Sequence, residues 1–270
     1  MKEIPWQILI FRKSLKKKEK LYLINKHFQI NPDYLILDLG CSQGTISYFL
    51  KEKGGKWVHV DFDSLNIKNA RPLLKRNIVQ IEQDKIPFFN NTFDMVISLD
   101  YLEHLDEDES CLKEIRRVLK PGGKLLISVP MTGKFFLINK LRQLLGMKPE
   151  VYGHKREGYK FDELKEKLEK NGFNVLIFET YSKFVTELIE LFLNFLYAKL
   201  FSRIKTTKSR AGLISPSSEM EIKEHGRAFK LYSFLHPLLS LITKFDKLLF
   251  FKKGYASVVW AEKKWNSEKK

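Results

Sequence analysis

Cysteine is scarce in this sequence of 270 residues, and its scarcity excludes several kinds of site. The two cysteines, Cys41 and Cys111, provide neither a disulfide framework nor metal-ligand spacing, so we expect a reducing, cytoplasmic setting and no metal site. Long uncharged runs are also missing. No stretch of 18 residues lacks a charged side chain, which argues against an ordinary membrane span. A secretory signal is not expected, because the apolar run at residues 8–11 is short and Arg12 interrupts it.

Acidic residues are too few to balance the basic ones, and the net charge is +16. The excess lies in the flanks. Residues 1–30 hold 8 Lys and Arg against 2 Asp and Glu, and residues 182–270 hold 17 against 8, which leaves 23 against 22 in residues 31–181. Basic flanks are typical of proteins that bind nucleic acid or anionic lipid, and they also occur on plain soluble surfaces. The charge alone does not decide between these partners.

Residues 31–181 alternate between short apolar runs and segments with helical spacing. Strands are predicted at residues 34–39, 56–61, 77–83, 93–100, 124–129 and 173–179, and helices at 44–53, 106–119 and 161–171. The helix over 106–119 is expected to stop at Pro121, Gly122 and Gly123. Strands that alternate with helices build a parallel sheet covered on both faces. The sequence therefore predicts a doubly wound α/β fold.

A glycine turn follows the first predicted strand. Gly40 and Gly44 stand where a helix must begin at once, which suits a tight turn and a close backbone approach to a ligand. Asp61 ends the second strand, where an acid can accept hydrogen bonds from both ribose hydroxyls of a nucleotide. Asp84 follows the third strand and could meet an adenine amino group. A simple turn and solvated surface acids remain the alternatives.

These segments resemble class I S-adenosylmethionine-dependent methyltransferases, and most closely the type 11 group. The family's first motif reads Asp-x-Gly-x-Gly-x-Gly, which Asp38, Gly40 and Gly44 match, with Ser42 in place of the middle glycine. The later segments IPFFNNTFDMVISLDYLEHL and LKEIRRVLKPGGKLLISVP are similar to the family's next motifs, in the same order. The resemblance implies a mostly parallel seven-stranded, Rossmann-like sheet. It also implies S-adenosylmethionine as the cofactor.

The resemblance also implies which residues hold the cofactor. They are Asp38, Gly40, Cys41, Ser42, Gly44, Asp61, Phe62, Asp84, Lys85, Ile86 and Asp100. The glycine turn would wrap the methionine part, Asp61 would hold the ribose, and Phe62 would pack near the adenine. Asp84 would meet the adenine amino group, with the backbone of the next two residues beside it. Asp100 would lie at the mouth of the site, and Asp38 would brace the first loop.

Two histidines are candidate catalytic residues. Methyl transfer from a sulfonium depends mainly on in-line positioning of the nucleophile, but a base helps when the acceptor is a hydroxyl. His104 follows the fourth predicted strand, and His154 lies in a segment similar to one that some sugar- and lipid-modifying members carry before the sixth strand. Structural roles, as a helix cap for His104 and in loop packing for His154, are the alternatives.

The chain departs from the resembled family between its last two strands, which typically form a near-direct hairpin. We divide it into a basic amphipathic arm (1–30), a methyltransferase domain (31–181 and 254–264) and a helical apolar insertion (182–253). The insertion starts at the ligand-binding edge of the sheet, so it is expected to roof the active site. Its wide apolar helices, and the arm with Trp6, are compatible with an anionic membrane surface, and the alternative is that the helices pack on each other or in a dimer.

The leading functional hypothesis is O-methylation of a lipid, lipid-linked sugar or glycan, near the inner face of a membrane. Nucleic-acid methylation is disfavoured, because Ser98-Leu99-Asp100-Tyr101 replaces the (Asn/Asp)-Pro-Pro-(Tyr/Phe) run of enzymes that methylate exocyclic base nitrogens. A non-catalytic S-adenosylmethionine-binding subunit is a further alternative. The Gly-x-Gly-x-x-Gly spacing of a nicotinamide dehydrogenase is missing. The sequence leaves the oligomeric state open.

Overall fold

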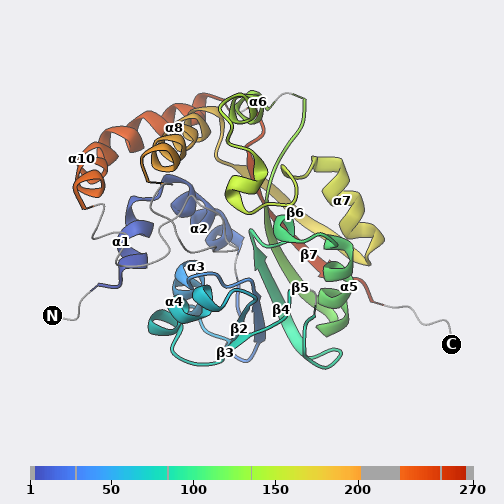
Figure 1. Ribbon diagram of the computed structural model, residues 1–270. Helices are drawn as coiled ribbons and strands as arrows, with labels where there is room; N and C mark the ends of the chain where they lie inside the picture. The colour runs from blue at the N-terminus through green and yellow to red at the C-terminus, as the bar shows by residue number, and fades with distance from the viewer. Residues whose placement is uncertain are drawn as a thin grey trace.

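The computed structural model describes residues 4–27, 29–83, 85–134, 136–201, 226–249 and 251–265, which surround one seven-stranded sheet (Figure 1). Its strand order is β3-β2-β1-β4-β5-β7-β6. The strands are β1 (Leu35–Leu39), β2 (Lys56–Asp61), β3 (Ile78–Gln80), β4 (Phe93–Leu99), β5 (Leu119–Pro130), β6 (Phe173–Tyr181) and β7 (Ala256–Lys263). Strands β1 to β5 pair in parallel, and β7 runs antiparallel to both β5 and β6. The predicted mostly parallel α/β fold is confirmed.

Helices cover both faces of this sheet. They are α1 (Trp6–Lys13), α2 (Leu15–His27), α3 (Thr45–Lys51), α4 (Ser64–Leu74), α5 (Asp108–Val118), α6 (Leu137–Leu144), α7 (Phe161–Lys170), α8 (Phe184–Phe201) and α10 (Gly226–Ile242). Short 3₁₀ turns are η1 (Leu102–His104), η2 (Pro149–Tyr152) and η4 (Thr243–Leu249). Among the described helices, none is long and apolar enough to cross a bilayer.

The central strands are buried on both faces, as parallel strands between helices must be. On one face, Leu37 and Leu39 of β1 pack in a cluster with side chains of α5 and α7. On the other face, Ile36 of β1 packs with Ile24 of α2 and Leu50 of α3. This alternation of successive side chains between two cores fixes the register of β1, and with it the position of the turn that follows.

Two predicted boundaries differ from the structure. The helix predicted over 106–119 ends at Val118, and β5 begins at Leu119 rather than at Lys124. Pro121, Gly122 and Gly123 therefore lie inside the strand, next to a register shift in its pairing with β4. Such an irregularity accommodates proline and glycine within a strand. Residues 202–225, within the insertion predicted over 182–253, lie outside the described residues.

The N-terminal arm packs on the domain through its apolar face. Ile8 is buried against the α4 side chains Ile67 and Leu73, and the Phe11 ring lies 4.5 Å from that of Phe49, between ring centroids. Trp6 is half-buried. Helix α8 contacts α6 and η4, and η4 also contacts α10, so these elements form one layer that lies above the sheet in Figure 1. The apolar face of the arm is thus packed against the domain, whereas several apolar side chains of α10 are exposed.

Candidate active site

A cavity of about 230 Å³ opens at the carboxyl ends of β1, β2 and β4. It is lined by Lys17, Lys20, Asp38, Gly40, Cys41, Ser42, Gln43, Thr45, Ile46, Ser47, Asp61, Phe62, Asn66, Leu99, Asp100, Tyr101 and His104. Ligands bind at this edge of open α/β sheets. Among the described lining residues, Lys17 and Lys20 belong to α2, and none belongs to the insertion over 182–253. Helix α2 rather than the insertion therefore lies directly over the cavity.

The glycine turn and the end of β2 lie side by side. Gly40 and Gly44 adopt φ angles of 78° and 77°, which favour glycine. A Cβ atom at Gly40 would lie 2.3 Å from Cδ2 of Tyr101, so the position has no room for a side chain. The backbone N–H of Ser42 donates a hydrogen bond of 2.8 Å to Oδ2 of Asp61. One small ligand can therefore span the turn and the acid.

Asp61 is held by a ring of donors and is only 3% exposed. Besides Ser42, the N–H of Asp63 and the side-chain amide of Asn66 donate to its Oδ1, at 2.9 and 3.2 Å. Burial raises the pKa of Asp61 despite these hydrogen bonds. The donors fix the orientation of the carboxylate at the cavity wall, and a carboxylate with about four lone-pair sites can still accept from a ligand hydroxyl.

Asp38 and His59 form a buried pair behind the turn. Nδ1 of His59 lies 2.7 Å from Oδ2 of Asp38, and both residues are almost fully buried. The backbone N–H groups of Gly40 and Cys41 both donate to the carbonyl of Val60, at 2.9 Å. These bonds tie the turn to β2. The bracing role of Asp38 stays a prediction.

Of the residues expected to hold the adenine, only one is found to line the cavity among the described residues. Asp84 lies outside the described residues. Lys85 forms an exposed ion pair with Glu82, and Ile86 is buried, but neither is among the described residues that line the cavity. Phe62 does line it, with its ring centroid 5.9 Å from that of Tyr101.

Asp100 lies at the mouth of the cavity and is paired with a lysine from the N-terminal arm. Lys20, only 4% exposed, forms an ion pair with Oδ2 of Asp100, and Ser128 donates to Oδ1 at 3.0 Å. Removal from water would raise the pKa of Asp100, but the charge and hydrogen bond of Lys20, together with the Lys16 charge and the Ser128 hydrogen bond, leave the pKa lowered. Sequence reasoning missed Lys20 and Lys17 as lining residues, because a run of lysines usually marks a solvated face.

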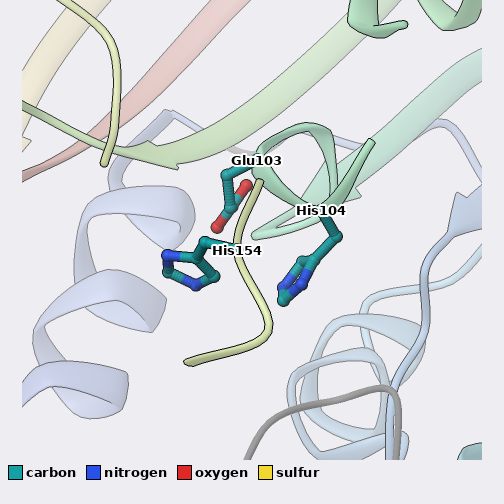
Figure 2. Close-up of side chains that lie close together, drawn as sticks. All are labelled: Glu103, His104 and His154. Atoms are coloured by element: carbon teal, nitrogen blue, oxygen red, sulfur yellow. The ribbon is translucent and has the colours of Figure 1, made fainter. Parts of the chain in front are cut away.

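Glu103, His104 and His154 form a two-histidine cluster beside the cavity (Figure 2). His104 lines the main cavity, whereas His154 lines a second cavity of about 90 Å³ near α6 and η2. Nδ1 of His104 donates to the carbonyl of Gly153 at 2.8 Å, and the two imidazole centroids lie 4.8 Å apart. Burial lowers the pKa of His104, and burial followed by the His104 charge lowers that of His154 to about 3. Both rings are therefore neutral at pH 7.

A buried acid joins three helices above the site. Glu187 of α8 is fully buried and accepts from Lys16 of α2, Arg142 of α6 and the hydroxyl of Ser182. Burial alone would raise the pKa of Glu187, but the charges of Lys16 and Arg142 lower it to about 2. We call these four residues the Glu187 network. It fixes α2, which carries Lys17 and Lys20, relative to the insertion.

Comparison with known proteins identifies the domain. The protein-family model described as "Methyltransferase domain" matches residues 37–127, from β1 into β5. The chain is 33% identical over 106 residues to the ubiquinone/menaquinone biosynthesis C-methyltransferase UbiE of Paraburkholderia phytofirmans, covering 36% of this chain and 44% of that protein. The chain thus spans less than half the length of the curated relatives first matched.

Solved structures share the fold across most of the chain. An S-adenosylmethionine-dependent methyltransferase of Methanosarcina mazei aligns with a TM-score of 0.53 and 17% identity, over 90% of this chain and 98% of that one. The [4+2]-cyclase SpnF aligns with a TM-score of 0.60 and 17% identity, over 93% and 82%. Enzymes that are named for different reactions therefore share this fold, so the fold alone does not identify the domain. The identification of the domain rests on the family match. From β1 into β5, the chain contains a class I S-adenosylmethionine-dependent methyltransferase domain of the type 11 group.

Proposed function

We propose that this chain transfers the methyl group of S-adenosylmethionine to a hydroxyl of a lipid, lipid-linked sugar or glycan at a membrane surface. The observation that carries the methyl-transfer part is the single cavity in which the Gly40–Gly44 turn and Asp61 meet through the Ser42 N–H. An S-adenosylmethionine molecule whose ribose is bound by Asp61 would place its methionine part along that turn. The named C-methyltransferase relative acts in quinone biosynthesis, which supports a small-molecule acceptor.

The protein's part in the reaction would be binding and positioning. The cofactor supplies an electrophilic methyl group on sulfur, so the chain has to hold an acceptor oxygen in line with it. Gly40, Cys41, Ser42 and Gly44 would hold the methionine part, with Asp38 and His59 keeping the turn in place. Asp61 would orient the ribose.

The acceptor hydroxyl would be activated at the two-histidine cluster. A carbonyl only accepts hydrogen bonds, so Nδ1 of His104 carries the proton, and Nε2 of this neutral ring offers a lone pair. His104 also lines the cavity, which places it among the groups an acceptor would meet. His154 is a weaker base at neutral pH, because its pKa of about 3 leaves little affinity for a proton.

The membrane part of the proposal rests on the surface of α8, α10 and η4. Their exposed apolar side chains include Leu188, Phe192, Leu231, Phe234, Leu238, Leu241, Phe245 and Leu248. The same elements carry Lys199, Lys230, Lys244 and Lys247. Apolar residues beside lysines suit an anionic lipid interface, where the rings enter the headgroup region and the ammonium groups meet lipid phosphates.

The test is transfer of a labelled methyl group from S-adenosylmethionine to fractionated acceptors. The full chain is incubated with membrane lipids, lipid-linked glycans and RNA, each in parallel with an Asp61→Ala variant as the inactive control. Label in a lipid or glycan fraction that depends on Asp61 supports the proposal. Label confined to RNA contradicts the acceptor class, and calorimetry without binding of S-adenosylmethionine contradicts methyl transfer itself.

A further inference from the structure

The two-histidine cluster gathers three potential metal ligands at the wall of the cavity. Glu103, His104 and His154 each offer one ligand atom, and these atoms lie within 4.8 Å of one another. In Figure 2 the Glu103 carboxylate lies above the two imidazole rings, with His154 below it on the left and His104 on the right. Glu103 and His104 come from η1, just after β4, and His154 comes from the segment after η2. Two separate chain segments thus converge here.

Glu103 is a buried acid with one unsatisfied carboxylate oxygen. It is 1% exposed, and among the described residues its buried Oε2 has no hydrogen-bond partner. A buried carboxylate oxygen without a partner is costly, and native proteins rarely leave one without a reason such as a bound ion.

The hydrogen bond of His104 leaves one of its ring nitrogens for a metal ion. His104 donates its Nδ1–H to the carbonyl of Gly153, as metal-binding histidines commonly donate their second nitrogen to a backbone carbonyl. This leaves Nε2 of His104 as the free lone pair. The His154 ring lies next to it, with 4.8 Å between the two ring centroids.

We propose that Glu103, His104 and His154 hold a divalent transition-metal ion, represented here by Zn²⁺. Two imidazole nitrogens and one carboxylate, with a coordination position left open, form a common catalytic zinc site. Magnesium and calcium prefer ligand sets made of oxygen, so they fit this cluster less well. The cysteine count pointed to no metal site, because spacing rules for cysteine do not detect ligands contributed by two distant segments.

Binding requires a small closure of the segment that carries His154. Zinc–ligand distances of about 2.1 Å place two ligands of a tetrahedral ion about 3.4 Å apart, so a separation of 4.8 Å has to shrink by about 1.4 Å. The segment is already attached to η1, since the Lys155 N–H donates to the Glu103 carbonyl at 2.8 Å and Gly153 accepts from His104. The ion would pin residues 149–154 to the end of β4.

The catalytic consequence rests on the proposed function, whereas ion binding does not. An open coordination position at the cavity wall would take the acceptor oxygen and lower the pKa of its hydroxyl. The hydroxyl proton would pass to solvent, the oxygen would bond to the methyl carbon, and the electron pair of the broken carbon–sulfur bond would stay on sulfur. His104 would then serve as a ligand and not as a base.

The test measures Zn²⁺ binding to the full chain, freed of any affinity tag and of metal by a chelator. Calorimetry is expected to give one ion per chain, and Zn²⁺ is expected to raise the melting temperature. His154→Ala is expected to weaken binding more than about 100-fold, since even losing an outer-shell partner costs about 10–100-fold. His27→Ala is the matched control. His27 lies 3.1 Å from Glu179, a histidine–glutamate pair for which no third ligand is found among the described residues.

Glu103→Gln keeps the proposal testable if an alanine variant fails to fold. It is expected to abolish the stabilisation by Zn²⁺ while melting no lower than the metal-free parent, because glutamine keeps the size of the side chain and Oε2 of Glu103 has no hydrogen bond to lose among the described residues. A purely structural glutamate would instead melt lower when changed. Zn²⁺ binding no tighter than Mg²⁺ binding, or unaffected by both substitutions, overturns the metal site. Zn²⁺ binding without methyl transfer leaves the metal site standing and overturns the proposed function alone.

Discussion

The two walls of the cavity are held in place by different kinds of bonds. On one side, which we call the cofactor wall, the turn after β1 and the end of β2 are joined by the Ser42–Asp61 hydrogen bond, between residues 19 positions apart. We call the side that is lined by Lys17 and Lys20 of α2 and by His104 the acceptor wall. There, Lys16 of α2 and Glu187 of α8 form an ion pair across 171 positions. The first wall depends on backbone geometry in a short stretch of chain. The second depends on charged side chains that meet only after the whole chain has folded.

This difference predicts that each wall can be weakened separately. The largest effect on stability is expected for Glu187→Gln, which leaves Lys16 and Arg142 without their buried counter-charge. Breaking a buried pair by removing one partner costs about 3–5 kcal/mol. Urea unfolding at pH 7 measures the loss, while calorimetry with S-adenosylmethionine is expected to change less than about threefold, as for distant sites.

The same variant gives a defined pH dependence. The folded pKa of Glu187, about 2, lies below its ordinary value of 4.5, so its contribution is complete above pH 4.5 and is lost as the pH falls toward 2. The difference in stability between parent and variant should therefore shrink through that window. Glu166→Gln, which breaks the exposed pair with Lys170, is the control and should leave the free energy of unfolding nearly unchanged, because solvent screens such a pair. Equal losses for both variants would contradict the Glu187 network.

The cofactor wall was readable from the sequence because its determinants are local. Gly40 and Gly44 need a backbone that only glycine adopts easily, and Asp61 follows a strand whose apolar run is plain. The six strands predicted between residues 34 and 179 were located for the same reason, although β5 begins earlier than expected because an irregularity in its pairing accommodates Pro121.

The acceptor wall was readable only in part. His104 and His154 were named as candidates, but no spacing in the sequence links His154 to Glu103, and the hydrogen bond of Lys155 to the Glu103 carbonyl brings them together. Lys20 belongs to a lysine-rich helix whose pattern does not distinguish a buried lysine from a solvated one. Contacts between distant segments leave no periodic pattern in the sequence, so only the structure reveals them.

An intermediate effect, confined to the cofactor wall, is expected for Asp61→Ala. It removes an acid proposed to accept a hydrogen bond from the ribose, and a hydrogen bond to a charged group is worth about 1.5–3 kcal/mol, so affinity for S-adenosylmethionine should fall about 10–150-fold. Calorimetry measures this, with circular dichroism to verify folding. Asp33→Ala, at an exposed acid just before β1, should bind like the parent. Unchanged affinity in Asp61→Ala would remove Asp61 from the site.

The smallest effect on stability, and a selective one on location, is expected for the outer surface of α10 and η4. Phe234 and Phe245 are 81% and 59% exposed, so changing both to serine should alter the free energy of unfolding by less than about 0.5 kcal/mol each. If these rings enter a lipid interface, the double variant should lose flotation with anionic vesicles while binding S-adenosylmethionine like the parent. Phe89→Ser is the matched control, because Phe89 is 89% exposed on the sheet domain. Equal flotation of the parent and both variants would mean that these two rings do not enter the lipid. Either the lysines alone or no part of this surface would then contact lipid. The insertion would in that case contribute to the acceptor wall only by supporting α2.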